Sequence, residues 1–196
     1  MIDRRAILAS VLPSGEPRLS GAIVLDQFRV MDDLFGHDVV AAACKKLPEP
    51  MQRELASLIA AGWCPLDVSE AIFGVVGDAI GRTGLEVHAE VCRVSVERTV
   101  RTVWRIFLRL TTDDALMKRT PLLYTKAFDR GECTAKMVGA GRADLRVSEW
   151  PTISIMQMQG LAIGTETVLR VAGRKDVRVH RERTPGGAIF HAHWRV

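Results

Sequence analysis

The C-terminal segment GGAIFHAHWRV (186–196) holds the residues of this chain that look most suited to chemistry. His191 and His193 are separated by one residue, and strand geometry places residues i and i+2 on the same face. Two imidazoles so placed can reach one zinc ion, but zinc needs at least a third protein ligand. His180, in the preceding segment VRVHRER, is the nearest candidate for that ligand. We therefore expect no metal site, and keep the set His180, His191 and His193 as the alternative.

The alternation of residue types along this segment favours a structural interpretation of the histidines. Phe190 and Trp194 share one face with small apolar neighbours, whereas His191 and His193 share the opposite face. Antiparallel sheets commonly bury one face and expose the other. The segment is therefore predicted to be a strand whose apolar face lies in the core and whose histidines face solvent.

No reaction motif occurs elsewhere in the chain. The sequence lacks the phosphate-binding pattern GxxxxGK[ST], the nucleophile elbow GxSxG and the zinc motif HExxH. The adjacent acids Asp32–Asp33 and Asp113–Asp114 point apart on a helix, which makes them poor acid–base pairs. We therefore expect a protein without enzymatic activity. A metal-dependent enzyme built on the three histidines is the least favoured hypothesis.

The composition is that of an ordinary globular protein that buries a core. Of 196 residues, 47% are hydrophobic and 26% are charged, and the net charge is +4. No apolar run approaches the roughly 18 residues of a membrane span, and four scattered cysteines without a CxxC pair suit the reducing cytoplasm. We expect residues 1–17 to form an N-terminal arm or short strand, and residues 18–196 to form a single domain.

Hydrophobic periodicity predicts helices in the first two-thirds of the chain and strands near its end. The expected helices span 20–36, 37–47, 50–61, 68–82, 85–110 and 116–128, the last with a break around Pro121. The expected strands and helix that follow are 132–138, 142–149, helix 151–172 and a final hairpin. The predicted fold is α+β: an N-terminal helical bundle packed on a four-stranded, mainly antiparallel sheet, with the order β-β-α-β-β in the C-terminal part.

The helix predicted over 151–172 carries Gly160 and Gly164 four residues apart. Glycine inside a helix costs about 1 kcal/mol relative to alanine, which indicates that another element approaches closely. Tight packing of this helix on the sheet is the simpler explanation. The alternative is that Met156, Met158, Gly160 and Gly164 line a slot for an apolar ligand, because methionine adapts to varied shapes.

A row of arginines follows the helix predicted over 85–110. Four-residue spacing stacks such side chains on one helix face. The row is explained by a solvated surface or, alternatively, by an anionic partner, either a protein or a nucleic acid. Nucleic acid is the less favoured partner, because aromatic residues for base stacking are not interleaved. The arginines concerned are Arg93, Arg98, Arg101, Arg105 and Arg109.

Several segments together resemble a family of small proteins expanded in myxobacteria, which carry a domain of unknown function numbered 2378. The resemblance covers roughly 18–196 and rests on LSGAIVLDQFRVMDDLFG, Trp63–Cys64–Pro65, the Gly160 helix and the hairpin entry Ala172–Val179. More distantly, a helical bundle followed by β-β-α-β-β is similar to a superfamily that includes vinyl-reductase-type small-ligand domains, haem nitric-oxide-binding domains and subunits of the TRAPP trafficking complex.

The distant resemblance implies a non-enzymatic small-ligand-sensing or adaptor domain in bacterial signalling. Members of that superfamily bind small hydrophobic molecules or act as interaction subunits, often as dimers. The resemblance therefore implies a small hydrophobic ligand, a protein partner and a homodimer. An interaction module that uses the arginine row is the alternative.

Two branches of the superfamily bear on cofactors and pocket residues. The haem branch uses a helical histidine and a Tyr-x-Ser-x-Arg element, whereas Tyr124 in YTKAF lacks the serine and the arginine. We therefore expect no cofactor, and in particular no haem. The acylated branch uses a cysteine that faces an apolar tunnel, which makes Cys64 and Cys92 candidate pocket residues.

Overall fold

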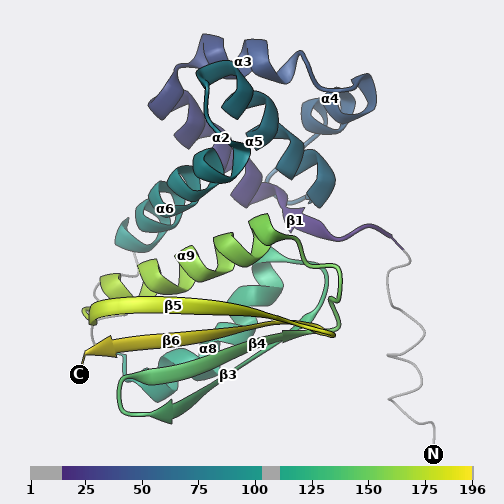
Figure 1. Cartoon of the computed structure of the whole chain (residues 1–196). Coiled ribbons are helices and arrows are strands. Elements are labelled where there is room, and N and C mark those ends of the chain that lie inside the picture. Colours follow the sequence, from purple (N-terminus) through teal and green to yellow (C-terminus); the bar gives the residue numbers. More distant parts are fainter. Residues whose placement is uncertain (1–14, 103–110, 196) are drawn as a thin grey trace, which may run out of the picture.

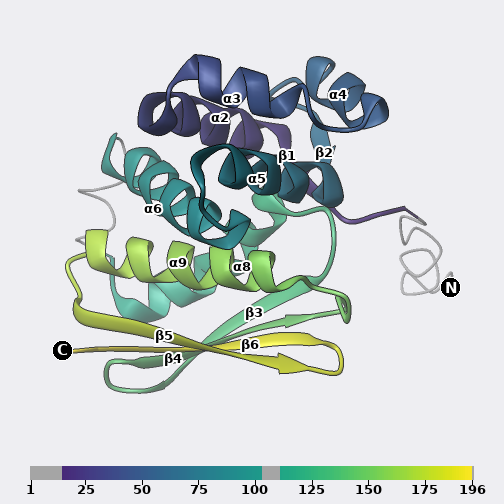
Figure 2. The same ribbon diagram turned by 45° about the horizontal axis from the view of Figure 1, so that its top comes forward.

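The structure is a computed structural model that describes residues 15–102 and 111–195, without the side chains of residues 101 and 102. It consists of two layers. A helical layer lies above a four-stranded sheet (Figure 1), and two further helices pack on the face of that sheet that is turned toward this layer (Figure 2). In chain order the elements are β1 (Arg18–Ser20), α2 (Gly21–Phe35), α3 (His37–Cys44), α4 (Glu49–Ala56), β2 (Trp63–Pro65), α5 (Leu66–Ile80), α6 (Gly84–Thr102), α8 (Asp113–Ala127), β3 (Glu132–Gly139), β4 (Arg142–Ser148), α9 (Ile155–Val171), β5 (Lys175–Thr184) and β6 (Gly187–Arg195).

The predicted α+β architecture is confirmed. The large sheet has the strand order β3-β4-β6-β5, and every neighbouring pair is antiparallel. The two outermost strands are therefore β3 and β5. Each of them carries an irregularity in its register, between Met137 and Gly139 in β3 and between Lys175 and Arg178 in β5.

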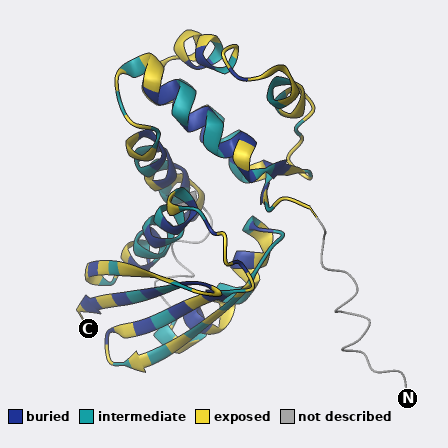
Figure 3. Ribbon diagram, turned by 45° about the vertical axis from the view of Figure 1, so that its right-hand side comes forward, coloured by how far each residue is buried: buried dark blue, intermediate teal, exposed yellow. Residues whose placement is uncertain are grey.

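The two faces of the sheet differ as the alternation in β6 predicts. Phe190 and Trp194 are only 1% and 7% exposed, whereas His193 is exposed and His191 is half-buried. Both α8 and α9 cover the face that carries Phe190 (Figure 2). Figure 3 shows the resulting alternation of buried and exposed bands along the strands. We call the covered side the inner face and the other side the outer face.

A second, small sheet was not among the elements expected from the sequence. Residues Arg18–Ser20 pair antiparallel with Trp63–Pro65, so that Leu19 lies opposite Cys64 and both are buried. Gly21 follows directly, and a Cβ there would lie 2.2 Å from the carbonyl oxygen of Ile59. Strands of three residues are too short for a period of two to be recognised. Most of the expected N-terminal arm, residues 1–14, lies outside the described residues.

The break predicted around Pro121 does not occur. Helix α8 runs without interruption from Asp113 to Ala127, with Pro121 inside it. Leu116 before the proline and Tyr124 after it are both buried, so packing on both sides holds the helix together. The helix predicted over 85–110 is described as far as Thr102, and residues 103–110 lie outside the described part. In the described residues, no helix combines the length and the apolar character needed to cross a bilayer.

Candidate functional site

A cavity of about 320 Å³ lies between the two layers. Helices α2, α6, α8 and α9 and the inner face of the sheet form its walls. Leu116 and Leu123 of α8, Leu145 of β4, Val168 of α9 and Phe190 of β6 supply much of its apolar surface. This volume lies at the lower end of the range of about 300–1,000 Å³ that is typical of small-molecule sites. The cavity is therefore large enough for a small, mostly apolar ligand.

One wall of the cavity is polar. His88, Cys92, Ser95 and Thr99 all line it from α6, because residues at these helical spacings share one face. Gln27 of α2 joins them, and its Nε2 donates to Cys92 Sγ over 3.5 Å. A ligand in the cavity would therefore meet a mainly apolar lining, with a cluster of hydrogen-bonding groups along α6.

His88 is the most unusual group in this wall. Its side chain is buried, with 3% of its surface exposed, and its Nε2 lies 3.2 Å from Cys92 Sγ. Burial lowers the pKa of His88 to about 4, and the nearby Gln159 amide acts in the opposite direction. Nevertheless His88 Nδ1 and Gln159 Oε1 are both buried without hydrogen-bond geometry to any partner among the described residues. The imidazole is therefore neutral at neutral pH and keeps unused hydrogen-bonding capacity.

The buried imidazole should make the protein less stable at acid pH. The pKa of His88 is about 4 in the folded protein, below the ordinary value of 6.5 that it regains in the unfolded chain. Because the unfolded chain binds the proton first, the stabilisation is fully present above pH 6.5 and is lost as the pH falls towards 4. We expect a loss of up to about 3 kcal/mol, measured as the free energy of unfolding in urea across this range.

The variant His88→Leu serves as the control for this pH dependence. Leucine does not titrate, so the variant should lose this part of the acid destabilisation while all other titrating groups remain. The same dependence of unfolding free energy on pH in both proteins would contradict the assignment to His88.

The cysteine thiols are not activated nucleophiles. Burial raises the pKa of Cys92 to about 12, and the hydrogen bond from Gln27 offsets only part of that effect. Burial likewise raises the pKa of Cys133, which lines the cavity from β3, to about 11. Because the thiolate is the reactive form, these thiols pack as weakly polar groups. The described lining thus offers hydrogen bonding and a neutral imidazole, and no cysteine nucleophile.

The two glycines of α9 have different structural roles. A Cβ at Gly160 would lie 3.0 Å from His88 Cε1 and 3.4 Å from its Nε2. The close approach that the sequence indicated is therefore to α6, and not to the sheet. Gly164 has nothing within 4 Å of an added Cβ, and it lines the cavity. Gly160 thus leaves room for the His88 ring, and Gly164 leaves more space in the cavity.

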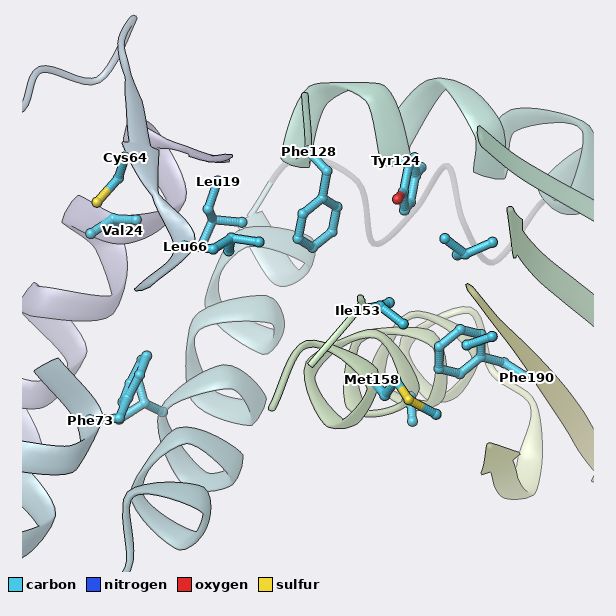
Figure 4. Close-up of a cluster of buried hydrophobic side chains, with 14 of the residues drawn as sticks. Leu19, Val24, Cys64, Leu66, Phe73, Tyr124, Phe128, Ile153, Met158 and Phe190 are labelled. Atoms are coloured by element: carbon cyan, nitrogen blue, oxygen red, sulfur yellow. The ribbon is translucent and has the colours of Figure 1, made fainter. Parts of the chain in front are cut away.

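Of the pocket residues expected from the sequence, the structure brings Cys92, Gly160 and Gly164 together at the cavity. Met158 is buried and Met156 is half-buried, and neither is among the lining residues. Cys64 is buried in β2 beside the helical layer, well away from Phe190 (Figure 4). These three residues belong to the packed core.

Sequence reasoning missed the polar members of the site, His88 and Gln27, and the contribution of α8. The sequence did contain an indication that His88 faces the same way as Cys92, because the two residues are four positions apart in a segment predicted to be helical. No comparable signal existed for Gln27. It lies 65 positions away from Cys92 along the chain, and only the packing of α2 on α6 joins them.

The arginine row is described only in part. Arg93 is exposed, and Arg98 forms a 2.6 Å ion pair with Asp33 in which both side chains are largely exposed. Such a surface pair contributes little to stability. The side chains of Arg101, Arg105 and Arg109 lie outside the described residues.

The three histidines considered for a metal site lie on the outer face of the sheet. His180 stands opposite His191, whose Nδ1 lies 2.8 Å from Asp144 Oδ1. Within residues 15–102 and 111–195, no group of three or more His, Cys, Asp or Glu side chains could hold a metal ion. The described structure therefore gives the metal-dependent enzyme hypothesis no site.

The fold is shared with solved structures of H-NOX proteins. An Fe(II) unliganded H-NOX protein from K. algicida is 8% identical, with a TM-score of 0.66 over 90% of this chain and 97% of that one. An oxygen-binding H-NOX domain related to soluble guanylate cyclases, in its oxygen complex, is 15% identical, with a TM-score of 0.60 over 90% and 95%. A structure from a study of heme redox potential and porphyrin distortion is 14% identical, with a TM-score of 0.65 over 90% and 99%.

At these identities the likeness shows the fold alone. No protein-family model and no curated protein matches the chain. The distant resemblance to haem nitric-oxide-binding domains therefore agrees with the fold, whereas the resemblance to the family with domain 2378 gains no support.

The expectation that the chain takes no cofactor, and in particular no haem, is overturned by this finding, because the proteins that share its fold include structures studied for their heme and for oxygen binding. That expectation depended on the missing Tyr-x-Ser-x-Arg element, which is a local sequence motif. At 8–15% identity, packing and topology are shared although most residues differ, so the absence of a single motif does not exclude the fold.

Proposed function

We propose that this chain is a small-ligand-sensing domain without enzymatic activity, and that the cavity between α6, α8, α9 and the sheet is its ligand site. The observation that carries the proposal is the cavity itself, whose lining is mainly apolar and includes a cluster of hydrogen-bonding groups on α6. Ligand sites commonly combine a mainly apolar lining with a few polar groups that fix orientation. The shared fold with oxygen-binding H-NOX proteins supports the same class of role.

Haem is one candidate occupant, and His88 is the residue that would hold it. Histidine is a common axial ligand of haem iron, and it must be neutral to bind the metal. The His88 imidazole lines the cavity, has a pKa lowered to about 4 and, within the described part of the chain, leaves Nδ1 without a hydrogen-bond partner. Haem bound there would supply an iron centre that takes a diatomic gas. The chain's own part would be to place the imidazole and to surround the porphyrin with apolar side chains.

Native mass spectrometry of the purified full chain tests this proposal. We expect a bound small molecule in the protein as purified, or uptake of one equivalent after incubation with haemin or with the neutral apolar probe decanol. An absorption band of bound haem that changes in His88→Leu would assign haem to this cavity. If the protein takes up neither probe and carries no molecule of its own, the proposal fails. The same spectrum measures whether the chain forms the expected homodimer.

A further inference from the structure

Four cationic side chains gather on the outer face of the sheet. Alternation along the strands and the pairing register place Lys136 of β3, Arg142 and Arg146 of β4 and Arg178 of β5 on this side. All four are exposed. We call these four residues the cationic face. The covering helices α8 and α9 lie on the opposite side of the sheet, as does the cavity (Figure 2).

The centre of the cationic face is a row across three strands. Arg142 and Arg178 both pair with His193, one from each side, so the two guanidinium groups flank a histidine. The two arginines are therefore separated by two strand spacings, roughly 10 Å, on the same face of the sheet.

The carboxylates of the outer face make their closest contacts with other residues. Asp144, which stands opposite Lys136 in the pairing register, lies 2.8 Å from His191, and Glu182 lies 3.8 Å from the same ring. Asp176 pairs with Arg195, at 3.1 Å. None of the four cations forms an ion pair with any side chain of the described residues. The cationic face thus presents four exposed cations that form no ion pair within the described residues, although two carboxylates lie on the same face.

We propose that the cationic face docks an acidic protein surface. Three of its four cations are arginines, which are enriched in protein interfaces and bind carboxylates through two parallel hydrogen bonds. Ile189, half-buried between Arg146 and Glu182 in the pairing register, adds an apolar contact near the centre. Single-stranded nucleic acid is the weaker match. Its binding sites stack bases on aromatic rings, and the aromatic residues of these strands, Phe190 and Trp194, are buried on the inner face.

The size of the face indicates a transient partner. Four strands about 4.8 Å apart and about seven residues long, at about 3.3 Å per residue, span roughly 440 Å². A stable interface buries about 800 Å² on each partner. An interaction of this size depends mainly on charge, so it should weaken steeply as salt is added.

The test measures binding of the full chain to a short fluorescein-labelled peptide of glutamate and alanine, by fluorescence anisotropy at low salt. The variant Arg142→Glu/Arg178→Glu should raise the dissociation constant by about tenfold or more, because two attractive contacts become repulsive. The matched control is Lys118→Glu/Arg119→Glu on the exposed side of α8, which changes the net charge by the same amount. The control should bind almost as well as the unchanged protein.

Each outcome decides the proposal. Selective loss of binding in the Arg142/Arg178 variant supports it, provided that circular dichroism shows the same fold and thermal transition. An equal loss in both variants would mean that only net charge matters, and would overturn it. It would also be overturned if the unchanged protein did not bind the peptide, or bound an oligonucleotide of equal charge more tightly. The cavity plays no part in this measurement, so its outcome is independent of the proposed ligand site.

Discussion

Replacing Phe190 by alanine is expected to lower the free energy of unfolding by about 3–5 kcal/mol. The ring is 1% exposed, belongs to the core and forms part of the cavity wall. Its removal takes away apolar contacts, and the space that it leaves adjoins the existing cavity, so neighbouring side chains cannot close it. Urea denaturation followed by circular dichroism measures the loss.

The control is His193→Ala, three residues further along the same strand and on the outer face. A surface substitution of this kind usually changes stability by less than about 0.5 kcal/mol. Losses of similar size in Phe190→Ala and His193→Ala would contradict the assignment of the two faces, and with it the position of the cavity.

Filling the cavity from Gly160 is expected to abolish ligand binding. In Gly160→Leu the new side chain starts 3.0 Å from His88 Cε1, so it must displace the imidazole and occupy the space beside it. We expect binding of the ligand found by mass spectrometry to weaken at least about 100-fold, which corresponds to about 2.7 kcal/mol. Overpacking should also reduce stability by about 1–3 kcal/mol. Titration calorimetry and thermal unfolding measure the two effects.

Gly164→Ala, one turn further along the same helix, provides the matched control. An added Cβ there meets nothing within 4 Å, and alanine favours a helix over glycine by about 1 kcal/mol. This variant should therefore be more stable than the unchanged protein and should still bind the ligand. If Gly160→Leu bound as tightly as Gly164→Ala, the ligand would have to bind elsewhere.

The features of the fold that were predictable are those with a long, regular pattern. In β6 apolar residues alternate with polar ones, which was enough to place Phe190 inside and His193 outside. The long helices and the β-β-α-β-β order follow from periods of 3.6 and 2 in the same way. The pair β1–β2 has no such pattern, because it depends on contacts between segments of three residues that lie about 45 positions apart.

The candidate site was predictable only where one helix carries it. Gly160 and Gly164 could be nominated because glycine stands out within a helix, whereas Cys92 was nominated through the resemblance to a branch with a tunnel cysteine. The reason for Gly160 could not be inferred, since it depends on His88 of another helix approaching the same point. The same limit explains Gln27, whose position depends on how α2 crosses α6. Residues of different helices that come into contact only through packing produce no periodic pattern in a single sequence.

The irregular register of the two outermost strands affects the tendency of the protein to aggregate at high concentration. An edge strand offers unpaired backbone groups to which another chain can add, and this is a route to aggregation. Here β3 and β5 each carry a register shift near one end, and β5 is a succession of charged residues over Arg181–Arg183. Bulges and charges on an edge hinder the regular pairing that a further strand requires. The sheet should therefore stay at four strands, and concentrated solutions should remain free of fibrils.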